Sequence, residues 1–165
     1  MTSIEDQIRE LPDFDAADIY ISKLSLTGIA IDRDRRELLL VDDGSLRRSP
    51  LSSIVGCEIL EDGIQVAYAN IGSQFAWMAA GGIAAGAIGA LVGGLLAPTA
   101  STNNVKKVVL RFATNHFDKP NHDIVLLDRS WSKKGVDRDS VIYKKALETA
   151  ELWNGRVVSM MIAGD

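Results

Sequence analysis

Residues 75–97 read FAWMAAGGIAAGAIGALVGGLLA, a stretch without a charged side chain that consists almost wholly of Gly, Ala, Ile, Leu and Val. At a spacing of four residues its small side chains fall on two neighbouring rows, which allows the backbones of two helices to approach closely. This pattern is a glycine zipper and predicts helix–helix association. The rows are Gly82, Gly86, Ala90 and Gly94, and Gly81, Ala85, Gly89 and Gly93.

The length of this apolar run leaves three arrangements open. One membrane span needs about 20 apolar residues and a hairpin of two spans about 40. The run therefore fits a single span, a shallow or re-entrant hairpin, or a zipper packed against copies of itself in a soluble oligomer. Phe75 and Trp77 suit a membrane interface or the rim of a packed core. We expect self-association or membrane contact through Gly81, Gly82, Gly86, Gly89, Gly93, Gly94, Phe75 and Trp77.

The sequence on both sides of this segment has the pattern of one β-rich domain. Short runs of strand type extend from Ile19 to Asn70 and resume at Val105. We expect the strands before Asn70 and after Val105 to belong to one sheet, in which case the insert must return to the side of a membrane that it left. We therefore divide the chain into an N-terminal helical arm (1–18), a β-domain with a C-terminal helix (19–70 and 105–165) and the glycine-zipper insert (71–104).

Local signals predict particular elements of this domain. Ile4, Ile8 and Leu11 have helical spacing before a proline, which predicts a short N-terminal helix. The pair Asp43-Gly44 predicts a tight turn between strands. A C-terminal helix is expected from about Ser140 to Asn154, with Asp139 or Ser140 as its N-cap and Gly155 at its end. Val157 to Ile162 is then either a final strand or a continuation of that helix.

The order of these elements, about seven short antiparallel strands from Gly28 and then one helix, resembles the pleckstrin-homology-like (PH-like) fold of bacterial proteins. The resemblance implies an α+β fold, an antiparallel seven-stranded PH-like barrel or sheet with a C-terminal helix, interrupted by a Gly/Ala-rich helical or hairpin insert. It also implies a scaffold that assembles or binds and brings no catalytic residue with it. The phrases that carry the resemblance are Pro50–Gly56, Glu58–Gly63, Lys106-Lys107 and Tyr143–Ala146.

Charge and cysteine content narrow the possible partners. With 18 basic and 22 acidic residues the net charge is −4, which does not favour DNA or RNA as a main partner. Cys57 is alone, so no disulfide forms within the chain. The N-terminus lacks the basic and apolar regions of a secretory signal, so we expect a cytoplasmic protein that associates with the inner membrane if the insert contacts lipid.

Chemistry-bearing residues are few. His116, Asp118, His122 and Asp123 match no zinc spacing, so no metal site and no cofactor are predicted. Ser130–Lys133 fits Ser-x-x-Lys without the companion motifs of the enzymes that use it. We therefore expect no enzymatic activity.

Three hypotheses follow. The first is a non-enzymatic scaffold that forms homo-oligomers through the insert, at a membrane or beside one. The second is a membrane-inserting protein of the pore-forming or immunity type. The third is a domain that binds lipid headgroups or small ligands through basic turns, with carboxylates close enough in sequence to pair with them. The arginines of the third hypothesis are Arg33, Arg35, Arg36, Arg47 and Arg48.

Overall fold

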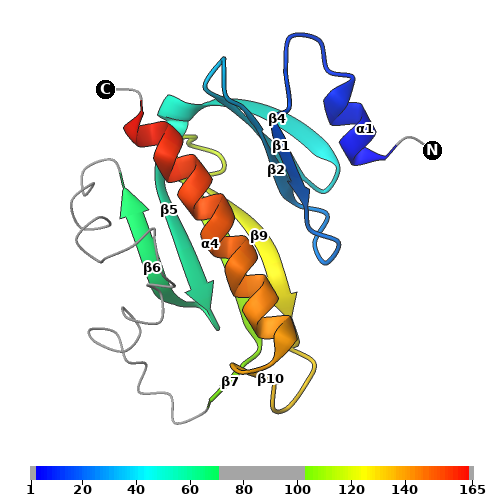
Figure 1. Ribbon diagram of the computed structural model, residues 1–165, viewed down its shortest axis with the longest axis vertical. Coiled ribbons are helices and arrows are strands. Elements are labelled where there is room, and N and C mark those ends of the chain that lie inside the picture. Colours follow the sequence, from blue (N-terminus) through cyan, green and yellow to red (C-terminus); the bar gives the residue numbers. More distant parts are fainter. Residues whose placement is uncertain (1–2, 71–102, 164–165) are drawn as a thin grey trace.

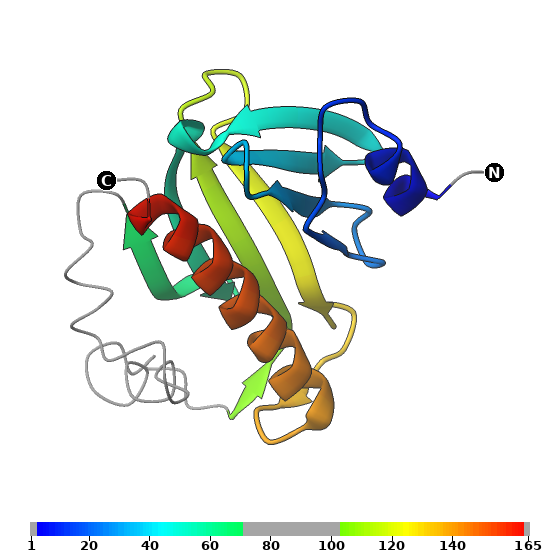
Figure 2. The same ribbon diagram turned by 45° about the horizontal axis from the view of Figure 1, so that its top comes forward.

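The computed structural model describes residues 3–70 and 103–163 of the chain. In these residues ten strands form three antiparallel sheets, with a short helix near the N-terminus and a long one near the C-terminus. Figure 1 shows the long helix lying across one four-stranded sheet, with the other four-stranded sheet beside it. The turned view in Figure 2 shows the same arrangement.

The first sheet is a meander in the order β1-β2-β3-β4. Its strands are β1 (Asp18–Ile21), β2 (Gly28–Asp32), β3 (Glu37–Asp42) and β4 (Ser45–Pro50). The predicted turn at Asp43-Gly44 is confirmed, because both residues have positive φ, 47° and 79°, as the tightest hairpin turns require.

The second sheet has the order β6-β5-β8-β9, so that β5 and β8 are its central strands. A short 3-10 helix, η1 (Leu51–Ser53), leads from β4 into it. A third sheet pairs two short strands, β7 (Asn104–Val105) and β10 (Val136–Asp137). The four long strands are β5 (Ile54–Glu61), β6 (Ile64–Asn70), β8 (Lys107–Thr114) and β9 (Asn121–Asp128).

Both faces of β2 and β3 are buried. Ile29, Ile31, Leu38 and Leu40 face the main core that the second sheet and the long helix complete. Alternate residues of the same strands, with Leu39 among them, pack in a second cluster with Ile8 and Phe14 of the N-terminal segment. This explains why β3 carries an unbroken apolar run in place of alternation.

The predicted N-terminal helix is present as α1 (Ile4–Arg9). Ser3 caps it by accepting a hydrogen bond from the Asp6 amide, while the Asp6 carboxylate accepts one from the Ser3 amide. Ile8 is fully buried against the first sheet. The arm is therefore packed on the β-domain through its apolar stripe.

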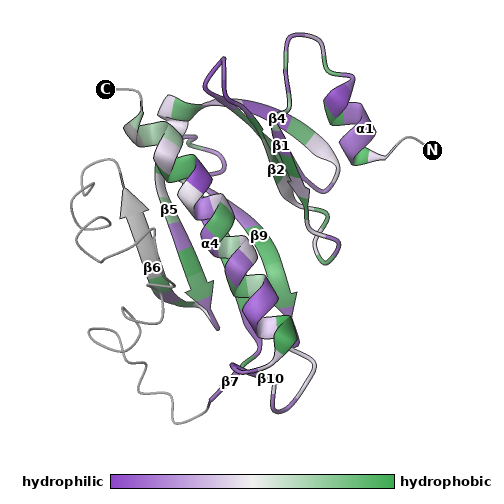
Figure 3. Cartoon of the chain, in the orientation of Figure 1, coloured by the Kyte–Doolittle hydropathy of each residue, from purple (hydrophilic) through white to green (hydrophobic). Residues whose placement is uncertain are grey.

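The C-terminal helix, α4 (Val141–Ile162), is longer than predicted. Ser140 is its N-cap, as expected, and accepts from the Tyr143 amide. The prediction that Gly155 ends the helix is wrong, because the buried stripe continues through Val157 on the next turn. Burying a Val stabilises by roughly 1.5–3 kcal/mol, which exceeds the cost of about 1 kcal/mol for one interior glycine. Figure 3 shows the alternating hydrophilic and hydrophobic faces of this helix.

The predicted seven-stranded barrel is not confirmed. The strand segments expected from Gly28 onward are present, but β1 adds a strand to the first sheet, and the third sheet adds β7 and β10. The sheets of the described residues remain separate and do not close into one barrel. They meet through side chains and through isolated contacts such as the Ser22 hydroxyl, which donates to the Val125 carbonyl of β9.

We predict that Gly155→Ala stabilises the protein by about 0.5–1 kcal/mol, because alanine restricts the unfolded chain and favours a helix interior. A Cβ atom at this position meets no heavy atom within 4 Å. Urea unfolding followed by circular dichroism measures the change. Gly28→Ala is the contrast and should destabilise, since its Cβ would overlap the Tyr20 carbonyl oxygen. Loss of stability in Gly155→Ala would contradict this account of the helix.

Candidate functional site

The two ends of the insert attach to one sheet at different places. Both β6 and β8 pair antiparallel with β5, so they run parallel to each other. Asn70, the last residue of β6, pairs with Gly56, whereas Val108 near the start of β8 pairs with Glu61. At about 3.4 Å per residue these pairing positions are about 17 Å apart along β5. The prediction that the flanking strands share a sheet is confirmed, and the insert connects opposite ends of that sheet.

The end at which the insert returns is held by a turn between β5 and β6. The Asp62 Oδ1 atom accepts hydrogen bonds from the Lys106 and Lys107 amides at 2.9 and 2.8 Å. The Asp62 amide donates to the Lys107 carbonyl at 3.0 Å. Asp62 and Gly63 both have positive φ, which makes the turn tight enough for this contact. One carboxylate thus fixes the start of β8.

A second set of contacts holds the residues just before β8. The Asn103 carbonyl accepts from the Arg138 amide at 3.1 Å, and the Asn103 side-chain amide donates to Asp137 at 3.2 Å. Next to these bonds, Val105 pairs with Val136 in the sheet of β7 and β10. The segment before α4 is therefore bonded to the segment that follows the insert.

A buried charged cluster lies directly beside this anchorage. The Glu61 carboxylate is 3% exposed, and it accepts hydrogen bonds from the Arg138 guanidinium and the Tyr143 hydroxyl. Arg138 Nη1 also donates to the Tyr143 hydroxyl at 3.0 Å, and its guanidinium carbon lies 5.6 Å from the centre of the tyrosine ring. Burial, followed by the hydrogen bond to Glu61 and the charge of Glu61, raises the pKa of Tyr143 well above its usual value.

The cluster stabilises the link between β5 and α4 only when it is complete. Removing one partner of a buried ion pair leaves an uncompensated charge, which typically costs 3–5 kcal/mol in a fully buried site. Arg138 is partly exposed, so the cost here should be lower. Together with Asp62, the cluster determines where the insert rejoins the domain.

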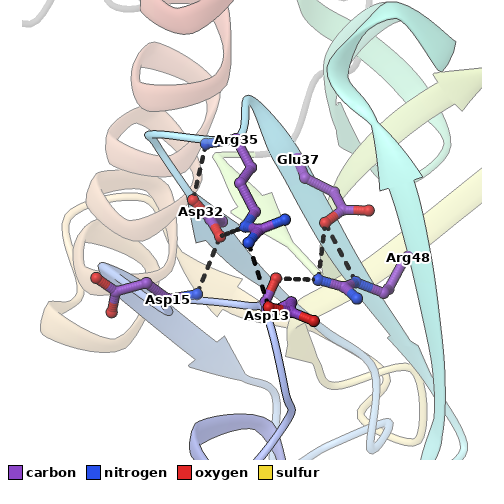
Figure 4. Close-up of polar contacts among 6 residues, drawn as sticks. All are labelled: Asp13, Asp15, Asp32, Arg35, Glu37 and Arg48. Atoms are coloured by element: carbon purple, nitrogen blue, oxygen red, sulfur yellow. Dashed lines mark hydrogen bonds and ion pairs between the residues drawn. The ribbon is translucent and has the colours of Figure 1, made fainter.

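Most of the predicted headgroup-binding arginines are bonded to the protein's own carboxylates. Arg33 pairs with Asp18 at 2.6 Å. Arg35 lies 3.4 Å from Asp13 and 3.8 Å from Asp32. Figure 4 shows Arg35 with Asp13 and Asp32, next to the pair of Arg48 and Glu37. Their positive charges are thus largely compensated.

The other three predicted arginines, Arg36, Arg47 and Arg48, lie in different places and differ in their contacts. Arg48 is 3.1 Å from Glu37 and also donates to the Asp13 carbonyl. Arg36 and Arg47 form no ion pair within the described residues. Arg47 lies in the edge strand β4, where it pairs with Leu40 of β3, whereas Arg36 lies in the β2–β3 turn. Headgroup binding here stays a prediction, and these positions weigh against it.

Asp32 organises the β2–β3 turn from inside the protein. Its side chain is 1% exposed and accepts hydrogen bonds from the Asp15 and Arg35 amides at 2.9 and 3.0 Å. Burial raises the pKa of Asp32, but these amide hydrogen bonds and the Arg35 charge outweigh burial, so the pKa lies below its usual range. This carboxylate has a structural role.

The histidine and aspartate residues of the β8–β9 region point in different directions. His122 is buried and donates from Nε2 to the Gly28 carbonyl at 2.9 Å, and burial lowers the pKa of this histidine. Asp123 follows it on the opposite face of β9 and pairs with Arg111 at 2.6 Å. His116 lies near Ser49. Within residues 3–70 and 103–163 no group of three His, Cys, Asp or Glu side chains is placed to hold a metal ion.

The zipper predictions and the polar cluster of Glu61 each lack a counterpart, the former in the described structure and the latter in the sequence predictions. The zipper glycines, Phe75 and Trp77 lie outside the described residues. The polar cluster of Glu61, Arg138 and Tyr143 was not predicted, because its members come from segments far apart in sequence. A signal for it exists: Cys57, Ile59 and Glu61 alternate along β5, so Glu61 occupies a core position where a buried partner is required.

Antiparallel sheets followed by one long C-terminal helix, with an interruption between two strands of one sheet, define a PH-like domain that carries an insert. The chain belongs to the family of glycine zipper containing PH domains, whose model matches residues 18–128. No solved structure matches. In the part of the chain that the structure describes, no helix combines the length and the apolar character needed to cross a membrane.

Two curated relatives are 32% identical to the chain over 110 residues. One is the Immunity protein of Bacillus phage SPbeta, where the match covers 64% of this chain and 53% of the relative. The other is the SPbeta prophage-derived uncharacterized membrane protein YomJ of Bacillus subtilis (strain 168), where it covers 64% of this chain and 47% of the relative. The chain therefore spans about half the length of the curated relatives it matches.

We predict that Tyr143→Phe lowers the free energy of unfolding at pH 7 by about 1.5–3 kcal/mol, the range for a hydrogen bond to a charged group. Because the pKa of Tyr143 is raised in the folded protein, its contribution is complete below pH 10, the ordinary pKa of tyrosine, and is lost as the pH rises beyond it. The difference between the two proteins should therefore shrink above pH 10. Urea unfolding from pH 7 to 11 measures it.

Tyr20→Phe is the matched control for this experiment. The Tyr20 ring packs near Trp153, and its hydroxyl has no hydrogen bond among the described residues. Removing that hydroxyl should change stability little at pH 7. An equal loss in the two variants would show that the Glu61 hydrogen bond is not the cause.

Proposed function

We propose that this chain is a non-enzymatic scaffold that self-associates at a membrane through its glycine-zipper insert. The observation that carries the proposal is the attachment of both ends of the insert to the same β-sheet. A domain of this kind holds the two ends of the insert at separate points of the sheet. Interior glycines each cost about 0.5–1 kcal/mol in a helix, which close packing between copies would offset.

The surroundings of the buried ionisable groups support a structural role for the β-domain. Glu61, Asp32 and His122 are each engaged by partners of the fold itself. Each of these contacts joins segments distant in sequence or secures a turn. Contacts of this kind would make the β-domain a rigid support for the insert. We propose no reaction for these buried groups.

Self-association is tested with variants in which zipper glycines are replaced. Gly86→Leu with Gly93→Leu places large side chains on the two rows and should shift the protein from a discrete oligomer toward the monomer. The measurement is light scattering coupled to size exclusion, in buffer and in a mild detergent. Ala84→Leu with Ala87→Leu adds similar volume outside the rows and should preserve the oligomer. If the glycine variant keeps the wild-type mass, the zipper is not the interface.

A second candidate function is that of an immunity-type protein that inserts the zipper into the bilayer. It is favoured by the similarity to a relative named Immunity protein and to one named a membrane protein. Two attachment points about 17 Å apart along the sheet would hold an inserted segment against the lipid from one side.

Alkaline carbonate extraction of bacterial membranes separates these two functions. An inserted protein should stay with the membrane pellet, whereas a scaffold bound at the surface should be released into the supernatant. Deletion of residues 75–97 is the control and should abolish any carbonate-resistant fraction. Complete release of the full chain would exclude insertion, and retention of the deletion variant would show that another segment anchors it.

A further inference from the structure

The loop between β9 and β10, residues 129–135, exposes a large aromatic side chain. Trp131 is 76% exposed, and the Arg129 guanidinium carbon lies 5.2 Å from the centre of its ring. The first turn of α4 adds Val141, 80% exposed, and Ile142, 50% exposed. Figure 1 shows that this loop and the start of α4 lie at the end of the molecule where β7 and β10 pair. The apolar side chains therefore gather at the end where the insert returns.

Exposed basic side chains come from the same loop and the same end of α4, and they lack acidic partners among the described residues. Lys133, Lys134 and Lys145 are exposed, and no carboxylate of the described residues lies within 4 Å of their amino groups. The nearby Asp139 and Asp128 are each within 4.0 Å of another lysine. Asp137 also lies here and forms no ion pair among the described residues, but Arg129, Lys133, Lys134 and Lys145 outnumber it. This end thus carries an excess of positive charge on a protein whose net charge is −4.

We propose that this surface, Trp131 with Lys133 and Lys134 and the first turn of α4, binds the headgroup region of an anionic bilayer. The proposal rests on the membrane association proposed above and names the contacting surface and the lipid class. Tryptophan favours the boundary between headgroups and acyl chains. Lysines next to it gain from the negative surface potential of anionic lipids, which also attracts Arg129.

The composition of the surface favours a bilayer over a protein partner. Lysine is depleted from the cores of protein–protein interfaces, whereas it is the expected neighbour of a tryptophan at an anionic membrane. The exposed residues come from a loop and from the first turn of a helix. The anchorage at Asn103 and Asp137 lies directly after this loop, so lipid contact here would place the return of the insert at the membrane surface.

Phe117 provides a comparison within the same chain. It is 98% exposed in the β8–β9 turn, at the other end of β9 from Trp131. The length of β9 separates the two turns by about 25 Å. The lysine nearest to Phe117 in sequence, Lys119, is paired with Asp42. The lysine nearest to Phe117 in sequence is thus compensated, whereas Lys133 and Lys134 near Trp131 form no ion pair among the described residues.

The experiment uses the full chain with Trp77→Phe, so that Trp131 and the buried Trp153 remain as fluorophores. Vesicles of phosphatidylcholine, with and without phosphatidylglycerol, are added and the emission maximum is followed. We expect a blue shift with the anionic vesicles that Trp131→Phe abolishes. In a sedimentation assay the double variant K133Q and K134Q should bind these vesicles about tenfold more weakly or worse, since each basic residue adds to attraction by an anionic surface.

Phe117→Ser is the matched control and should bind as the wild type does. If the Trp131→Ala and lysine variants bind anionic vesicles as tightly as the wild type, the proposed surface is wrong, although membrane association through the insert would stand. If the wild type binds no vesicle of either composition, the surface proposal and the membrane association both fail. Zipper variants that lose the oligomer but keep the Trp131 shift would support this surface and separate it from self-association.

Discussion

The structure depends on the pairing of β5 with strands on both of its sides. β6 and β8 come from opposite sides of the insert, and their hydrogen bonds to β5 unite these two parts of the chain in one sheet. A sheet formed in this way cannot be divided by a membrane. Because the antiparallel pairing makes β6 and β8 parallel to each other, the connection between them must also cover the length of β5. Topology therefore constrains the insert more strongly than its hydropathy does.

Polar contacts around the end of β5 make this arrangement specific. Asp62 fixes the main chain at the start of β8, and Glu61 reaches the opposite side of the strand toward α4. Hydrophobic packing alone would tolerate a shift of β8 by two residues, since its side chains alternate. A carboxylate that accepts two particular amides would lose them after such a shift. We infer that these contacts select the register, at the cost of burying a charge.

Period-two patterns and turn residues allowed much of the fold to be predicted. The Asp43-Gly44 turn and the α1 stripe follow from local signals that burial reinforces. The common sheet of β6 and β8 was expected from the strand patterns on both sides of the insert. The extent of α4 did not follow, because the packing of Val157 outweighs the local preference of a glycine. The open arrangement of the sheets was also missed. Closure depends on contacts between strands distant in sequence, which no local pattern encodes.

The two basic regions show why the candidate site was harder to predict than the fold. In sequence, the arginines of residues 33–48 form the denser cluster, yet folding brings Asp13 and Asp18 to them from another segment, in addition to the neighbouring Asp32. The lysines of the β9–β10 loop are fewer and keep their charge unpaired. A charge count along the chain cannot separate these cases, because compensation depends on which segments the sheets bring together. The electrostatic character of a surface is thus a property of topology, and here it is concentrated at the end where the insert returns.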